Sequence, residues 1–173
     1  MENQVNSKNL IVNKGLTLGA AMVLFSLVMY ATGNLLEPHW SGSLITSALF
    51  IGIVVWGIKS FKSENGGFLS WGQGVKIGVG IAIVAGLINV VYTYVLMNFI
   101  EPDLMNQMME VQNQMYIDSG MTEEQIENAN EMSKKFQSPG ITAAMGIIAY
   151  AIGGFIVSAI GAAIMKKSEE NQY

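Results

Sequence analysis

The residues that most often carry chemistry are scarce in this sequence. Its 173 residues include one histidine, His39, no cysteine and no arginine, so every basic side chain is a lysine. One histidine cannot supply the several ligands of a zinc site, and lysine lacks the bidentate contact with which arginine binds phosphate or carboxylate. The net charge of −4 argues against a nucleic-acid surface. We therefore predict no metal ion, no cofactor and no nucleic-acid partner.

Asp and Glu residues are present, but they lie outside the long apolar segments. No Asp, Glu or Lys lies deep within any of these segments. Proton relays and ion pathways in membranes depend on such intramembrane charges, and acid–base catalysis needs groups held close together in different protonation states. Only His39 with Glu37 is a candidate pair for chemistry on lipid. We predict a non-enzymatic protein without catalytic residues, and a lipid-modifying enzyme ranks third among the alternatives.

Asn89 is the most deeply placed amide in the sequence. Such a side chain can line a path for a substrate, or it can form a hydrogen bond to a neighbouring helix. The second role is the more usual one, and we expect it here.

Four apolar segments supply the elements that position these residues. Hydrophobic residues make up 51% of the chain and charged residues 13%, and the charges interrupt the apolar blocks only at their edges. A helix that crosses a bilayer needs about 20 mostly apolar residues. Four segments meet or approach this length: residues 15–36, 40–58, 77–100 and 141–165. The predicted fold is all-α, an integral membrane four-helix bundle that forms one domain, residues 1–173, in a lipid bilayer.

The lysines indicate how these helices are oriented. Lysine and arginine are enriched on the cytoplasmic side of membrane proteins. Only Lys134 and Lys135 lie between the third and fourth segments. The other seven of the nine lysines fall in three stretches that share the opposite side: Lys8, Lys14, Lys59, Lys62, Lys76, Lys166 and Lys167. We expect both termini to be cytoplasmic.

Small residues recur at a spacing of four along the third and fourth segments. In lipid, helices associate through close contact between such residues. They would either pack the helices of one chain together or form the face of a homodimer, and we favour packing within the chain. The candidate helix-packing residues are Gly74, Gly78, Ala82, Gly86, Gly154 and Ser158.

The connection at residues 101–140 is the only sizeable segment outside the predicted spans. Apolar residues recur at helical spacing from Leu104 to Met115, and residues 122–125 match a capping box. We expect a helical hairpin or two short helices over the extracytoplasmic mouth of the bundle. Their apolar faces form a candidate surface for a protein partner, with the residues Leu104, Met108, Met115, Ile126 and Phe136.

The first and third segments end alike. The first ends Asn-Leu-Leu-Glu-Pro at residues 34–38, and the third ends Asn-Phe-Ile-Glu-Pro at residues 98–102. One interpretation is a duplicated two-span unit, as in some transporters. The other is that Glu marks the exit from the bilayer and Pro ends each helix. Five positions do not separate the two.

Several of these features together resemble one known family. They are Lys14-Gly15-Leu16, the sequence GFLSWGQGVKIG at residues 67–78, and Phe99-Ile100-Glu101-Pro102-Asp103. Over nearly its whole length the chain resembles the uncharacterised bacterial membrane family called domain of unknown function 4199 (DUF 4199), seen mostly in Bacteroidetes. The resemblance implies a multi-pass, four-span protein of the bacterial inner membrane. It implies no activity and no catalytic residues.

Two functional hypotheses follow. The first is a small non-enzymatic scaffold or accessory subunit whose outer helices bind a protein partner. The second is a small transporter or channel subunit that acts as a homo-oligomer, assembled as a dimer along its glycine faces.

Reporter fusions test the predicted orientation. Alkaline phosphatase is active only outside the cytoplasm, so a fusion at Ser119 should be active and a fusion at Asn65 inactive. The reverse pattern would refute cytoplasmic termini.

Overall fold

Each of the four apolar segments forms a helix that is long enough and apolar enough to cross a membrane. The computed structural model describes residues 6–36, 40–136 and 138–167. Within these ranges the long helices are α1 (Ser7–Ala31), α2 (Trp40–Glu64), α3 (Trp71–Val95) and α6 (Pro139–Met165). A π-helical turn (Leu96–Ile100) prolongs α3, and two shorter helices, α4 (Leu104–Asp118) and α5 (Glu123–Phe136), lead to α6. The predicted all-α fold, with a helical segment between the third and fourth long helices, is confirmed.

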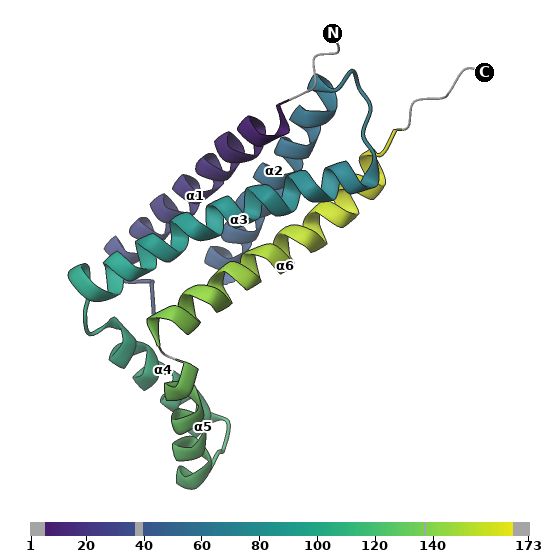
Figure 1. Cartoon of the computed structure of the whole chain (residues 1–173). Helices are drawn as coiled ribbons and strands as arrows, with labels where there is room; N and C mark the ends of the chain where they lie inside the picture. Colours follow the sequence, from purple (N-terminus) through teal and green to yellow (C-terminus); the bar gives the residue numbers. More distant parts are fainter. Residues whose placement is uncertain (1–5, 37–39, 137, 168–173) are drawn as a thin grey trace.

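The helix α3 lies between α1 and α6 (Figure 1). The helices α1 and α3 run in one direction, and α2 and α6 run in the other. As a result, α1 begins and α6 ends at the same end of the bundle, which we term the terminal end. The opposite end, where α4 and α5 leave the bundle, is the hairpin end.

Small residues bring α3 and α6 into close contact in the half of the bundle nearer the terminal end. A methyl group added to Gly74 would lie 2.5 Å from the Cβ of Ala162, and one added to Gly78 would collide with Ser158. Each step of four residues along α3 is matched by a step of four back along α6. The facing pairs are Gly74–Ala162, Gly78–Ser158, Ala82–Gly154 and Gly86–Tyr150. Because lipid is as apolar as the side chains, this close packing, rather than a hydrophobic gain, holds the two helices together.

The helix α1 packs on the other side of α3 in a parallel register. Methyl groups added to Gly15 and Gly19 would each lie 2.5 Å from a side chain of α3, that of Val84 or Ile88. From α2, Gly57 makes room for the tip of Ile81. The side chains buried between these helices include Leu18, Val54, Ile58, Ile77, Ile81 and Ala85.

The helices do not end where the apolar segments do. The first span was expected to reach residue 36, but α1 ends at Ala31. Gly33 follows with a φ of +72°, and the Asn34 N–H donates to the Met29 carbonyl oxygen at 2.9 Å. This is a glycine-based helix stop, which depends on backbone conformation and not on apolarity.

At the terminal end the helices extend beyond the apolar segments. The helix α2 continues past residue 58 to Glu64, and α3 begins at Trp71 instead of residue 77. A capping box formed by Ser70 and Gln73 starts α3. The backbone hydrogen bonds of a helix form in water as well as in lipid, so the helices continue through the lysine-bearing stretches.

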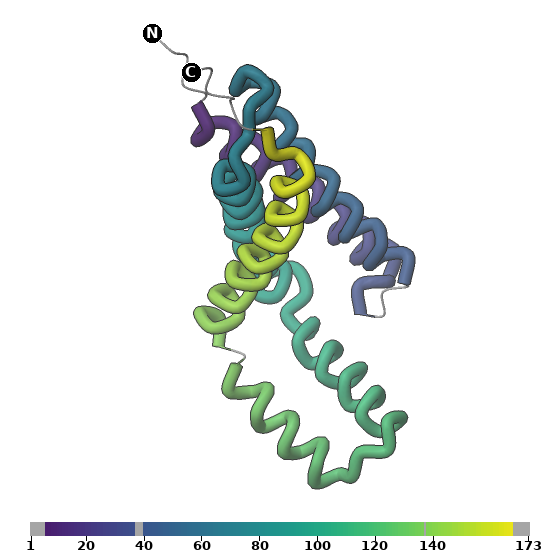
Figure 2. Tube along the Cα trace, turned by 90° about the vertical axis from the view of Figure 1, so that its right-hand side faces the viewer, coloured from purple at the N-terminus to yellow at the C-terminus, as the bar shows by residue number. Residues whose placement is uncertain are grey.

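The hairpin formed by α4 and α5 projects away from the bundle (Figure 2). The expectation that these helices lie over the mouth of the bundle is therefore wrong. The physical reason is a lack of apolar contact: Leu104 is the only buried residue of α4, and α5 has none.

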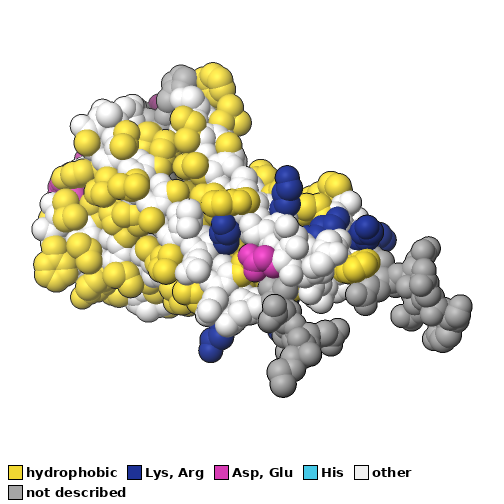
Figure 3. All heavy atoms as spheres, turned by 90° about the horizontal axis from the view of Figure 1, so that it is seen from above, with side chains coloured by type: hydrophobic (Ala, Val, Ile, Leu, Met, Phe, Trp, Pro, Cys, Tyr) yellow, Lys and Arg dark blue, Asp and Glu magenta, His cyan; other side chains and the backbone are white. Residues whose placement is uncertain are grey.

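The C-terminal end of α6 is tied to the connection between α2 and α3. Leu69 and Lys167 exchange two backbone hydrogen bonds of 2.9 Å. Lys62 Nζ donates to the carbonyl oxygen of Met165 at 2.7 Å, where the helix dipole favours a cation. Figure 3 shows that lysines gather near this end and that hydrophobic side chains cover much of the remaining face. Such a distribution fits a bundle whose terminal end lies at a membrane surface.

The variant Gly74→Ala is expected to destabilise the bundle by about 1–3 kcal/mol, because the added methyl group forces α3 and α6 apart. Moving the methyl group across the contact, in Gly74→Ala with Ala162→Gly, should restore part of this loss. Thermal unfolding in detergent, followed by circular dichroism, measures both effects.

Gly52→Ala is the matched control, since Gly52 lies in the middle of α2 with nothing within 4 Å of an added methyl group. Alanine there should be neutral or slightly stabilising. If Gly74→Ala unfolded at the same temperature as this control, the close contact would be disproved.

Candidate functional site

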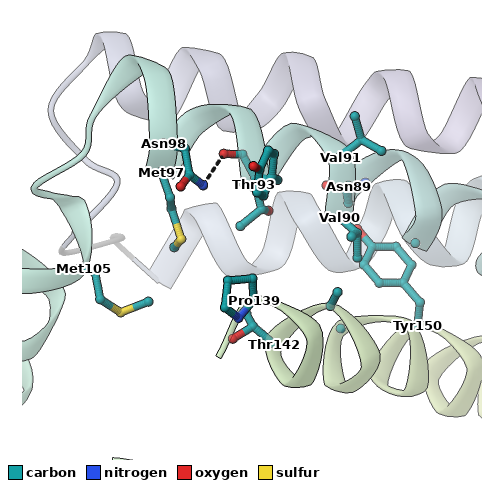
Figure 4. Close-up of a pocket in the computed structure, with 14 residues that line it drawn as sticks. Asn89, Val90, Val91, Thr93, Met97, Asn98, Met105, Pro139, Thr142 and Tyr150 are labelled. Atoms are coloured by element: carbon teal, nitrogen blue, oxygen red, sulfur yellow. Dashed lines mark hydrogen bonds between the residues drawn. The ribbon is translucent and has the colours of Figure 1, made fainter. Parts of the chain in front are cut away.

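The helices α3 and α6 separate toward the hairpin end because the run of small facing residues stops at Gly86. One turn further on, a methyl group added to Gly146 would approach Val90 only to 3.6 Å, an ordinary van der Waals distance. The separation leaves a cavity of about 490 Å³, which we term the α3–α6 cavity. Figure 4 shows its lining, with side chains of α3 and the π-helical turn opposite those of α6 and Met105 of α4 at the hairpin end.

A second cavity of about 450 Å³ lies between α1 and α2 at the same end, and we term it the α1–α2 cavity. Its lining is rich in hydroxyl groups, which come from Ser26, Ser43, Thr46 and Ser47. The two cavities therefore differ in character, one mainly apolar and the other more polar.

Asn89 and Tyr150 line both cavities and so stand between them. Asn89 Nδ2 donates to the carbonyl oxygen of Ala85, one turn back in its own helix, at 3.1 Å. The predicted hydrogen bond from Asn89 to a neighbouring helix is therefore wrong, because the cavities separate Asn89 from the facing helices. Its Oδ1 accepts no hydrogen bond from the described residues.

The Tyr150 ring is held in place from two sides. It packs edge-on against Phe50, with 5.8 Å between the ring centroids, and its Cβ lies over Gly86, where an added methyl group would come within 3.0 Å. Its hydroxyl makes no hydrogen bond within the described part of the chain. The ring is thus fixed while its polar end is available to a ligand.

The chemistry of this site is that of neutral hydrogen bonding. Among the described residues, neither cavity is lined by an acidic or basic side chain. In the part of the chain that the structure describes, no cluster of His, Cys, Asp and Glu is suited to hold a metal ion. The pair Glu37 and His39, predicted as the alternative for lipid chemistry, lies outside the described residues. The described linings thus offer apolar side chains and neutral hydrogen-bonding groups.

The fold buries some residues of the candidate partner surface and leaves others exposed. Leu104 is buried at the base of α4, and Ile126 is partly buried. Met108, Met115 and Phe136 are 47%, 63% and 56% exposed.

Met132, which the sequence analysis did not select, is 59% exposed. Its position four residues before Phe136, on the same helix face, is the signal that could have identified it. We term Met108, Met115, Met132 and Phe136 the hairpin stripe.

Glu101 connects the hairpin to the bundle through hydrogen bonds. Its carboxylate accepts hydrogen bonds from the Tyr30 hydroxyl of α1 at 3.0 Å and from Gln107 Nε2 of α4 at 3.2 Å. Its N–H donates to the Leu96 carbonyl oxygen at 2.8 Å and closes the π-helical turn. The sequence marks Glu101 as the exit of the third span, but only the structure shows that it joins α1, α3 and α4.

The candidate helix-packing residues are all buried within one chain. They lie in the contact between α3 and α6, and they are Gly74, Gly78, Ala82, Gly86, Gly154 and Ser158. In this fold these helix-packing residues are not free to form the face of a homodimer.

Comparison with known proteins identifies a family. The family described as "Protein of unknown function (DUF4199)" matches residues 13–167, a range that includes the hairpin, both cavities and most of each long helix. No curated protein and no solved structure matches the chain. With most of its length matched, the chain belongs to the DUF4199 family, as its sequence features predict.

Proposed function

We propose that this DUF4199 protein is a non-enzymatic scaffold or accessory subunit that binds a protein partner through α4 and α5. The observation that carries the proposal is the exposure of the hairpin stripe. Apolar faces of helices outside the membrane are normally buried against a core or a partner. The helix α5 has no buried residue, so its apolar side chains find no core within the chain.

The composition of the stripe supports this role. Three of its four residues are methionines, whose flexible, polarisable side chains adapt to partner surfaces of different shapes. Phe136 adds the kind of large anchor that carries much of the binding energy in protein interfaces.

The charges of the hairpin bear on the type of partner. Acidic residues are frequent along α4 and α5: Glu110, Asp118, Glu123, Glu124, Glu127 and Glu131. A partner with an apolar centre and a basic rim would therefore be complementary, and the opposite charges would speed its association.

The proposal includes an orientation and a compartment. Lysine enrichment on the cytoplasmic side supports a cytoplasmic terminal end, with both termini inside and the hairpin outside. In a bacterial inner membrane, the partner would then be an extracytoplasmic protein or domain.

The cavities support a second candidate, a small transporter subunit. Two cavities that meet at Asn89 and Tyr150 inside a membrane bundle provide space for a solute. The helix-packing residues of α3 and α6 are buried within the chain, so a homo-oligomer would have to assemble through another face. One such face is the surface of α2 around Gly52, which has open space around it.

Replacing Met115 with glutamate is expected to weaken partner capture about tenfold, since a charge then enters an apolar contact. Asn128→Glu is the matched control because it places the same charge on an exposed, polar position of α5. Capture is measured in cells with a photocrosslinking residue at Gln114, followed by mass spectrometry. The control should retain the partner that Met115→Glu loses; equal capture by both variants would contradict the proposal.

Flux measurements separate the two candidates. A scaffold in proteoliposomes gives no flux of ions or small neutral solutes above that of empty vesicles. A transporter gives a flux that Asn89→Leu lowers, because the substitution removes the amide shared by the two cavities. If correctly inserted protein gave no more flux than empty vesicles, the result would count against the transporter proposal.

A further inference from the structure

We propose that the two cavities together form a binding site for an uncharged, single-chain amphiphile, with a monoacylglycerol as the model compound. The hydrocarbon chain lies in the α3–α6 cavity, and the hydroxyl- or ester-bearing head faces Asn89 and Tyr150. Of the hairpin, only Met105 at the base of α4 lines this site. The site involves no residue of the hairpin stripe and does not depend on the partner proposed for it.

The α3–α6 cavity has suitable dimensions for one hydrocarbon chain. Its volume of about 490 Å³ falls in the usual range for small-molecule sites. Along α3 and the π-helical turn its lining extends from Gly86 to Asn98, about 18 Å at the helical rise of 1.5 Å per residue. That length is close to half of the bilayer's hydrocarbon core, which is roughly 30 Å thick. The cavity therefore spans about one leaflet at the hairpin end.

The walls of this cavity match an alkyl chain. Its lining is mainly apolar and includes Val90, Met97, Met105, Ala143 and Gly146, with Thr93, Asn98 and Thr142 as polar residues among them. The two methionines can adjust their conformation to the chain, and glycine and alanine leave room on the α6 side.

Polar groups at the inner limit of the cavity match a head with hydrogen-bonding groups. The Tyr150 hydroxyl and the Asn89 Oδ1 have no partners among the described residues. A hydroxyl on the ligand can donate to this Oδ1 and accept from Tyr150. Polar groups within a membrane protein cost free energy when they stay unpaired, so a ligand with such a head binds better than a plain hydrocarbon.

The polar α1–α2 cavity begins directly beyond these two residues. Its hydroxyl groups, including those of Ser26 and Thr46, offer further hydrogen bonds to the distal part of the head. The lining thus changes from mainly apolar in one cavity to more polar in the next, as an amphiphile changes from its chain to its head.

The described residues of both linings carry no charge, and this determines which amphiphiles fit. An ionised head would lose its hydration without gaining a counter-charge, and this cost is large inside a membrane protein. Neutral heads are therefore preferred to anionic ones.

The rim of the α3–α6 cavity indicates the route of entry. Val91 and Tyr94 line the cavity and are 64% and 53% exposed on the outer surface of the bundle. In a membrane this surface contacts lipid, so the ligand enters sideways from the bilayer.

Photolabelling tests the site. Full-length protein in zwitterionic nanodiscs is exposed to a monoacylglycerol with a diazirine near the end of its chain, and labelled peptides are mapped by mass spectrometry. We expect label within residues 86–98 and 139–150. Unlabelled monoacylglycerol should compete, whereas lysophosphatidylglycerol, with a similar chain and an anionic head, should compete poorly.

Two variants probe the two halves of the site. Gly146→Leu fills the apolar cavity and should remove most of the label, whereas the control Gly52→Leu, at an open position of α2, should keep it. Tyr150→Phe retains the ring contact with Phe50 and removes only the hydroxyl. It should weaken competition by the monoacylglycerol by about two- to tenfold, the effect of one neutral hydrogen bond.

Tyr150→Phe also keeps the test valid if Gly146→Leu does not fold. Label spread evenly over the outer surfaces of all four long helices would overturn the proposal. So would equal competition by the anionic lipid, or labelling and competition unchanged in every folded cavity variant.

Discussion

The close contact of α3 and α6 is the constraint on which the rest of the structure depends. Over Gly74, Gly78 and Ala82 the two backbones approach as nearly as small side chains allow, and in lipid such packing is the main source of helix association. It places α3 between α1 and α6, so that α3 carries most of the tertiary contacts. Because the small pairs end at Gly86, the same contact also determines where the helices separate and the α3–α6 cavity begins.

This cavity gives the neutral polar residues of the spans a role that is not purely structural. Asn89 bonds only to its own helix, and Tyr150 is held by ring packing with Phe50. Both side chains therefore present polar atoms toward the cavities without using them to bind another helix. A site built in this way discriminates by shape and by neutral hydrogen bonds, and a lining whose described residues are all uncharged disfavours ionic ligands.

The hairpin is the second region for which we propose a function, and the two proposals are compatible within one protein. Apart from apolar Leu104 and Met105 at the base of α4, it is joined to the bundle through Glu101, which bonds to Tyr30 and Gln107. The π-helical turn before Glu101 is of a kind often found at functional sites; it forms part of the cavity lining and leads into the hairpin. Met97, in the π-helical turn, and Met105, in α4, both line the α3–α6 cavity.

The sequence by itself determined the four long helices, the two short ones and the stripes of small residues, because apolar length, helical periodicity and residue size are local properties. The α3 cap at Ser70 and Gln73 and the helix stop at Gly33 are local signals as well, but our predicted span limits did not use them. Only the tertiary structure decided that the stripes of α3 and α6 face one another, that Asn89 and Tyr150 stand between two cavities, and that the hairpin projects from the bundle. The physical reason is that these features depend on distances between helices: where two helices separate is set by all of their paired side chains together, and no single segment of sequence encodes it.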